Sequence, residues 1–177
     1  MNTTQTILSR KTIRNFNGQQ PTQEELFAVL QAGQASPVGM KAYGSLLFTV
    51  VTSPRLIDFI ENNAKEKLGR EGKILYGAPV LIVVSTDVKN THSQNVAYSN
   101  AAIAVHNMAL QAVELGLGAC QIWGAVAMLN QNEQIVKEFD LPDGFVPACA
   151  LAVGKTEEVY TTREIPQDRI KTVFIKD

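Results

Sequence analysis

The sequence lacks an excess of charge of either sign. Lysine and arginine together number 16 against 17 aspartates and glutamates, which gives a net charge of -1. Such a chain has no global field to recruit nucleic acid or an anionic membrane surface. We therefore expect neither as a partner, and any anion site must be local.

Histidine and cysteine are also scarce. His92 and His106 stand in no metal-binding or catalytic motif, so we expect no metal site and a packed or hydrogen-bonded His106. Cys120 and Cys149 lie in apolar surroundings, which is typical of buried free thiols in a reducing compartment. No apolar run reaches the roughly 18 residues of a membrane span, and the first residues have no signal-peptide pattern. We expect a cytoplasmic protein.

The most unusual stretch that is present is the cationic segment Ser9–Phe16. Arg10, Thr12 and Arg14 are spaced at i, i+2 and i+4, so in an extended chain they project to one side. Two guanidinium groups and a hydroxyl can there bind a phosphate. Lys11 projects the other way, to solvent or a partner subunit. These residues alone leave open a second interpretation, a solvated basic loop.

A length of 177 residues fits one domain with a substantial core, residues 1–177. Apolar spacing and end signals predict helices at residues 3–9, from Thr22 to before Ser36, from Ser53 to near Gly69 or Gly72, from Thr91 to about Leu115 and from Asn130 to before Leu141. Runs rich in β-formers predict buried strands at 45–52, 79–85 and 146–153 and a strand or loop at 119–128. The apolar triplet 173–175 is predicted to add an edge strand, either within the chain or to a partner subunit.

Three capping boxes are predicted to open helices, at Thr22/Glu25, Thr91/Gln94 and Asn130/Glu133, and Gly116 is predicted to cap the 91–115 helix. That helix carries one narrow polar stripe (Asn100, Asn107, Gln111 and Glu114), and small apolar residues cover the rest, so it should be buried on nearly every side. Strand 79–85 is continuously apolar and should be central. Because strands and helices do not alternate strictly, we predict an α+β sandwich.

Several motifs, in order along nearly the whole chain, resemble those of the nitroreductase family. Arg10–Arg14 is similar to the family's Arg-x-Ser-x-Arg/Lys opening with Thr12 replacing serine, and Ala35–Gly39 is similar to its Ala-Pro-Ser-x-x loop. Met108–Gly118 resembles its Leu-x-Ala-x-x-x-Gly-Leu-Gly helix end, and Leu141-Pro142 and Val153-Gly154 match later landmarks. The chain departs from the pattern at Met40–Gly44, where the family commonly has Asn-x-Gln-Pro-Trp.

The resemblance implies an α+β fold with a mostly antiparallel central sheet flanked by helices, assembled as an intertwined homodimer. It implies FMN as cofactor and NADH or NADPH as reductant. Hydride would pass through flavin N5 to a nitroaromatic, a quinone or a similar small-molecule acceptor in a ping-pong cycle. No side chain is then required as a catalytic acid or base.

The resemblance also implies roles for particular residues. Arg10 and Thr12 would hold the FMN phosphate within a segment that includes Lys11, and Arg14 would reach the ribityl chain or the pyrimidine edge. Lys73 would lie near flavin N1 and O2, and Arg163 or Lys155 would complete the phosphate site. Two further groups would contact the ring: Ser36, Pro37, Val38 and Gly39 from the other subunit, and the backbone of Gln121, Ile122, Trp123 and Gly124 near N5 and O4.

Two alternatives remain at this point. The chain can be a flavin-binding or flavin-handling protein without rapid NAD(P)H turnover, which slow reduction of bound flavin would indicate. It can also be a structural α+β dimer with a basic loop, which a failure to bind FMN would indicate.

Overall fold

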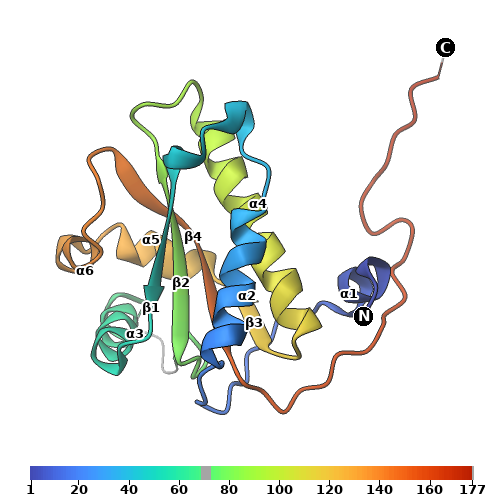
Figure 1. Cartoon of the computed structure of the whole chain (residues 1–177), viewed down its shortest axis with the longest axis horizontal. Coiled ribbons are helices and arrows are strands. Elements are labelled where there is room, and N and C mark those ends of the chain that lie inside the picture. Colours follow the sequence, from blue (N-terminus) through green and yellow to red (C-terminus); the bar gives the residue numbers. More distant parts are fainter. Residues whose placement is uncertain (69–72, 177) are drawn as a thin grey trace.

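The structure, a computed structural model, describes residues 1–68 and 73–176 and contains short helices as well as long ones (Figure 1). The elements in chain order are α1 (Thr3–Ser9), α2 (Gln23–Gln34), η1 (Gly39–Lys41), η2 (Tyr43–Ser45), β1 (Leu46–Val51), α3 (Pro54–Leu68), β2 (Val80–Asp87), α4 (Gln94–Glu114), β3 (Gly118–Gln121), α5 (Trp123–Leu129), α6 (Glu133–Glu138) and β4 (Phe145–Gly154). The predicted helix end near Gly69 or Gly72 lies outside the described residues.

The four strands form one sheet in the order β1-β2-β4-β3, and every neighbouring pair is antiparallel. β2 is central and buried over Val80–Thr86, as its continuous apolar run predicts. β1 lies at an edge and is mostly half-buried, so the prediction of a buried strand there is wrong. An edge strand has a partner on one side only, which is why its equally apolar sequence stays partly exposed.

Helices cover both faces of the sheet. Successive side chains of β2 point to opposite faces, so Leu81 and Val83 enter one core while Ile82 and Val84 enter the other. The first core includes residues of α3, α5 and α6, and the second includes residues of α2 and α4. The α+β prediction with an antiparallel sheet flanked by helices is confirmed.

Helix α4 is the longest element, and its small residues allow close packing against the sheet and α2. It ends as predicted at Gly116, whose φ of +71° lets its amide bond the Val113 carbonyl at 3.0 Å. The Leu117 amide then reaches the Ala112 carbonyl at 2.8 Å. The prediction that this helix is buried on nearly every side is correct only in part, because Val96 and Ile103 of α4 remain exposed in the single chain.

Two of the three predicted capping boxes do not form. The Thr22/Glu25 box is present, but Thr91 donates its hydroxyl to the Ser93 carbonyl instead of capping a helix. Asn130 donates its amide to the Pro147 carbonyl. The cap of α6 is Asn132, whose side chain accepts hydrogen bonds from the first turn.

Trp123 begins a helix, so the prediction of a strand or loop throughout 119–128 is wrong in its second half. Sheet pairing ends at Ile122, whose amide still donates to the Ala150 carbonyl at 2.9 Å. From there Ala125, Val126 and Leu129 bury one helical face in the core. This spacing fits a helix, but Gly124 and the preceding strand obscure it in the sequence.

The cationic segment is docked beside β3. The Ile13 amide donates to the Ala119 carbonyl at 3.0 Å, and the side chains of Ile13 and Phe16 enter the core. A Cβ at Gly118 would lie 2.8 Å from the Phe16 ring, so the absence of a side chain there permits this close approach.

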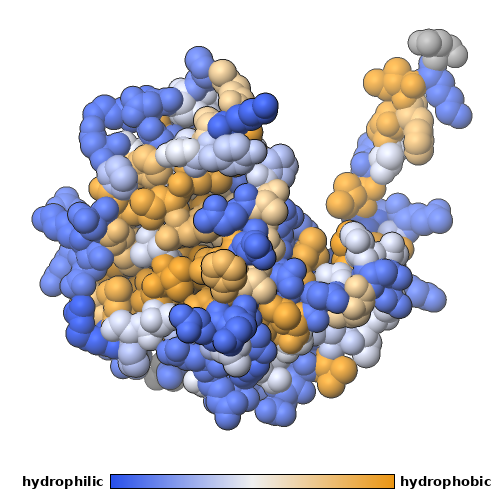
Figure 2. Space-filling view, in the orientation of Figure 1, coloured by the Kyte–Doolittle hydropathy of each residue, from blue (hydrophilic) through white to orange (hydrophobic). Residues whose placement is uncertain are grey.

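Beyond β4 the chain leaves the sheet and forms no helix or strand in the described part of the tail, residues 155–176 (Figure 1). The predicted edge strand at 173–175 is therefore not formed within this chain. Val173, Phe174 and Ile175 are 72%, 80% and 95% exposed. Figure 2 shows apolar side chains along this tail and around β1 and α2 on the body.

Replacing Ile13 with alanine should lower the free energy of unfolding by about 2–5 kcal/mol, because the side chain is fully buried and would leave a cavity. Denaturant titration followed by circular dichroism measures the change. The matched control is Ile7→Ala, where a half-exposed side chain should cost about 0.5 kcal/mol or less. Equal losses in the two variants would contradict the anchoring role of Ile13.

Candidate functional site

The docked segment turns its polar side chains away from the core. Ile13 is buried, whereas its neighbours Thr12 and Arg14 are exposed and Arg10 is half-buried. The burial of Ile13 between the exposed Thr12 and Arg14 fits the predicted alternation at these three positions.

Arg10 and Arg14 are unpaired. Within residues 1–68 and 73–176, neither guanidinium lies within 4 Å of a carboxylate. Lys11, between them, points away and pairs with Glu158 at 2.7 Å. The two arginines are therefore available to an anionic ligand, and Lys11 is occupied by its own chain.

Arg14 lies over an aromatic ring. Its Cζ atom is 5.7 Å from the centroid of Tyr76, within the range of a cation–π interaction. Both residues line a cavity of about 270 Å³. The other lining residues belong to the turn before β2, to β3 and to α5: Ile74, Cys120, Gln121, Ile122, Trp123, Gly124 and Ala125.

The backbone at the start of α5 is open on this side. Ile122, the residue before the helix, makes no side-chain cap. Trp123 is 58% exposed, and a Cβ placed on Gly124 would meet nothing within 4 Å. A flat ligand can therefore approach the Gln121–Gly124 backbone closely.

His106 reaches the same region from α4. Its Nδ1 atom lies 3.2 Å from the Gln121 side-chain amide, so the predicted hydrogen-bonded histidine is confirmed. Burial lowers the pKa of His106, and the nearby Arg10 lowers it further. Both effects favour the neutral form of the ring.

Neither cysteine offers a nucleophile. Both thiols are free and buried, as predicted. Burial raises the pKa of Cys120, although Arg14 offsets part of the effect, and burial raises the pKa of Cys149 to about 11. Both remain protonated near neutral pH, and a protonated thiol is a poor nucleophile.

The described residues contain no group of three or more histidine, cysteine, aspartate or glutamate side chains arranged to hold a metal ion. None of the helices in the described part of the chain is both long and apolar enough to cross a membrane.

The Ser36–Gly39 loop is held by the polar stripe of α4. The Ser36 hydroxyl accepts from the Asn107 amide at 2.9 Å, and the Gly39 amide donates to Asn100 Oδ1 at 3.1 Å. None of its residues lines the Arg14 cavity. Met40 and Lys41 follow with positive φ values of 57° and 58°, an uncommon conformation for residues with side chains.

Two predicted cations, Lys73 and Lys155, lie away from the Arg14 cavity. Lys73 lines a separate cavity beside α3 with Glu61, although its near neighbours Ile74 and Tyr76 line the Arg14 cavity. The Lys155 ammonium is bound by both oxygens of Glu25, at 2.6 and 2.7 Å.

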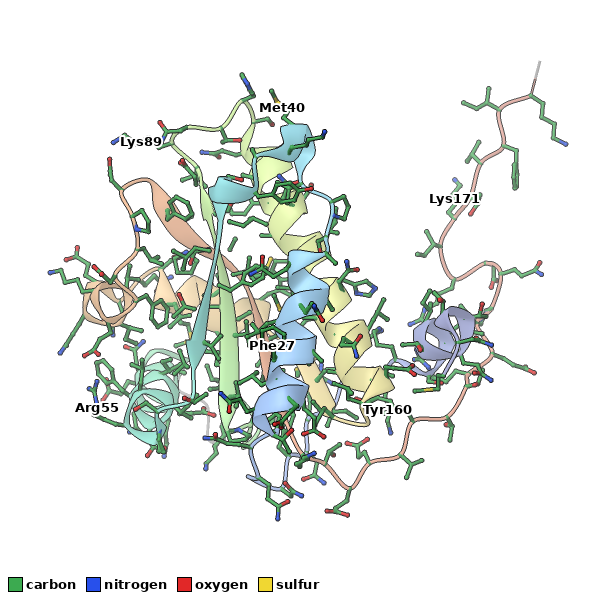
Figure 3. The ribbon with its side chains drawn as sticks, viewed as in Figure 1. Phe27, Met40, Arg55, Lys89, Tyr160 and Lys171 are labelled. Atoms are coloured by element: carbon green, nitrogen blue, oxygen red, sulfur yellow. The ribbon has the colours of Figure 1, made fainter. Side chains whose placement is uncertain are left out.

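Arg163 lies close to Arg10 but contacts its backbone. Its guanidinium donates to the carbonyls of Leu8 and Arg10. Tyr160, also on the tail and labelled in Figure 3, donates its hydroxyl to the Leu117 carbonyl at 2.7 Å. The tail therefore braces the cationic segment from behind.

Sequence reasoning did not identify Tyr76. The signal is the pair Tyr76-Gly77 just before the central strand, a turn with an aromatic residue in place of the usual small polar one. Gln121 was expected only through its backbone, and its side chain adds the contact to His106.

The antiparallel sheet between two helical layers defines an α+β protein, and two arginines without carboxylate partners lie in the segment docked beside β3. The chain belongs to the nitroreductase family, whose sequence profile matches residues 7–155. It is 29% identical over 165 residues to the FMN reductase (NADPH) of Bacillus subtilis. The aligned residues cover 86% of this chain and 65% of that relative. The chain thus spans less than two thirds of that protein.

Solved structures agree on the fold. A nitroreductase with bound FMN from Desulfitobacterium hafniense superposes with a TM-score of 0.83 at 24% identity, over 98% of this chain and 99% of the other. A second, from Bacteroides fragilis and also with bound FMN, gives a TM-score of 0.82 at 22% identity, over 98% and 100%.

The electrostatic contact between Arg10 and His106 can be measured directly. Arg10→Ala should raise the pKa of His106 part of the way towards its ordinary value, because a nearby positive charge disfavours protonation while burial persists. Titration of the His106 ring protons by NMR follows this shift. The matched control is Arg55→Ala on α3, on the opposite side of the molecule from the tail (Figure 3). An unchanged or lower pKa in Arg10→Ala would show that Arg10 does not act on this ring.

Proposed function

We propose that the protein is an FMN-dependent oxidoreductase that takes hydride from NADH or NADPH and reduces a small electrophile such as a nitroaromatic or a quinone. The observation that carries the proposal is the pair of unpaired arginines beside an open backbone, on a nitroreductase-family fold. The similarity to a protein named FMN reductase (NADPH) supports both the flavin and the nicotinamide. All of residues 1–177 are proposed to form one FMN-binding domain.

The side chains present fit FMN. A phosphate needs cationic or hydroxyl donors, which Arg10 and Thr12 supply on one side of an extended segment. A flavin ring needs a flat space with backbone donors at its edge, which the opening at Trp123 and Gly124 supplies. Arg14 lines the same cavity as Trp123 and Gly124, and we propose that it meets the ribityl chain or the pyrimidine edge there.

When bound, FMN would supply the hydride chemistry that no side chain of this cavity can supply. The chain's own side chains would position the cofactor and set the electrostatic environment of its ring. Arg10, Thr12 and Arg14 hold the anionic end and fix the ring, and Arg163 braces the backbone at Leu8 and Arg10. Burial keeps Cys120 protonated, so this thiol does not compete for the substrate. We propose that the nicotinamide and the acceptor share this cavity and bind in turn, as a ping-pong cycle requires.

Lys73 has a less direct place in this scheme. It is exposed at the start of the turn that carries Tyr76 and lies in a neighbouring cavity. We propose that it acts on the pyrimidine end through its charge at a distance.

A homodimer would complete the site. The cavity of about 270 Å³ is smaller than the roughly 300–1,000 Å³ of typical ligand pockets. The Ser36–Gly39 loop lies outside it in the same chain. We therefore propose that Ser36, Pro37, Val38 and Gly39 line the ring from the second subunit.

The tail and the sheet edge support the same assembly. β1 has an open edge, and the exposed triplet Val173–Ile175 extends away from the body (Figures 1 and 2). We propose that the triplet of one subunit packs against the other and buries apolar area there. The use of NAD(P)H together with two unpaired thiols supports a cytoplasmic location.

Arg10→Ala should weaken FMN binding by on the order of 10- to 100-fold, the scale of a lost charge-assisted hydrogen bond. Equilibrium dialysis of the apoprotein with FMN measures this change. Arg55→Ala, which removes an exposed arginine on α3, should bind FMN like the wild type. Full flavin retention by Arg10→Ala would contradict the phosphate role.

Bound flavin should be bleached rapidly by NADPH or NADH in a stopped-flow experiment under anaerobic conditions. Addition of a quinone or a nitroaromatic should then restore the oxidised spectrum. Initial rates at varied concentrations of both substrates should give parallel double-reciprocal lines, as expected for a ping-pong cycle. Slow or absent bleaching with both nicotinamides would favour the flavin-handling alternative instead.

Phe174→Asp should shift the protein from dimer to monomer, because the new carboxylate would have to be desolvated at the subunit contact. Sedimentation velocity across a concentration series measures this shift. Val159→Asp, an equally exposed apolar position outside the triplet, is the control and should remain dimeric. A dimer unaffected by Phe174→Asp would exclude the tail from the interface.

A further inference from the structure

The turn that carries Tyr76 has an unusual backbone. Tyr76 and Gly77 have φ values of 57° and 84°, and the Ala78 amide donates to the Leu75 carbonyl at 3.0 Å. Two central residues with positive φ are the pattern of a type I′ turn, where asparagine, aspartate or glycine is usual. A bulky residue is strained in this conformation, so something must hold it there.

Glu61 of α3 holds this turn. Its two carboxylate oxygens accept the amides of Ile74 and Leu75, at 2.7 and 2.9 Å. Leu75 is fully buried and anchors the turn in the core. One half-buried side chain therefore fixes two consecutive amides immediately before the strained residue.

The charges around Glu61 come from two elements. Burial raises the pKa of Glu61, and the two amide hydrogen bonds lower it in part. Lys73, on the turn, lowers it further, and Asp58, one helical turn earlier on α3, raises it. The two amide hydrogen bonds to Glu61 offset part of the cost of burying its carboxylate.

The strained residue faces the cofactor cavity. The Tyr76 ring lies under the Arg14 guanidinium, which has no carboxylate partner among the described residues. Without the ring, an exposed arginine would sample many rotamers, and ordering it on ligand binding would reduce affinity.

We propose that Glu61 is a positioning residue of the FMN site: it clamps the Ile74–Gly77 turn so that Tyr76 holds Arg14 ready at the cavity. The inference rests on the proposed function, because FMN is the ligand that Arg14 is proposed to bind. Glu61 itself contacts no ligand and acts through Tyr76.

The test is FMN affinity, measured by quenching of Trp123, the single tryptophan, which lines the same cavity. Glu61→Gln retains the size of the side chain but can accept with only one oxygen. It should weaken FMN binding about fivefold, the scale of a partly exposed cation–π contact. The control is Glu66→Gln, the same change at an exposed position of α3, which should leave the affinity unchanged.

Tyr76 variants separate positioning from stability. Tyr76→Gly removes the ring but relieves the strain, so the protein should be at least as stable while FMN binds about fivefold more weakly. Tyr76→Phe keeps the ring and should bind like the wild type. In the Tyr76→Gly background, Glu61→Gln should cause no further loss of affinity.

Two results would contradict the positioning role of Glu61. If Tyr76→Gly binds FMN normally, or if Glu61→Gln weakens FMN equally with and without the Tyr76 ring, the positioning role is overturned. If Glu61→Gln does not fold, the comparison of Tyr76→Gly with Tyr76→Phe still tests the ring. A wild-type protein that does not quench with FMN would overturn the proposed function itself, which is a separate result.

Discussion

The candidate site depends on one constraint, the docking of an extended backbone beside β3. The hydrogen bond between Ile13 and Ala119 and the burial of Ile13 and Phe16 fix the direction of the chain. Once Ile13 points inwards, the pleat of an extended chain leaves Thr12 and Arg14 no direction but outwards. The buried residues of this segment therefore determine the direction of its exposed charged side chains. Gly118 belongs to this arrangement because a side chain there would displace Phe16.

The predictions that succeeded rest on local physics. The continuous run of β2, the Thr22 capping box and Gly116 each contain within a few residues everything that determines the element. The capping boxes at Thr91 and Asn130 failed because a cap is a competition among nearby polar residues. Asn132 caps α6 while Asn130 bonds the Pro147 carbonyl, and α4 begins after Ser93 with no side-chain cap at all.

The candidate site was predictable only in part for the same reason. Spacing alone placed Arg10, Thr12 and Arg14 on one side, because the period of an extended chain is a local property. The ion-pair partner of a lysine depends on which carboxylate the tertiary fold places near it. Lys155 pairs with Glu25, which is 130 residues away in sequence. Tyr76 was missed because its importance lies in a strained turn and in a ring contact across the fold.

The contact that Arg163 makes with the arginine segment relates the candidate site to the order of folding events. Its guanidinium reaches the Arg10 carbonyl across 153 residues of sequence, so this contact closes a loop of almost the whole chain. Loops of that length form only after nearer contacts have reduced the freedom of the chain between them. The arginine segment thus gains its brace after residues 156–163 have left the ribosome. Ligand binding by a newly made molecule would then report that residues 156–163 have folded back onto the arginine segment.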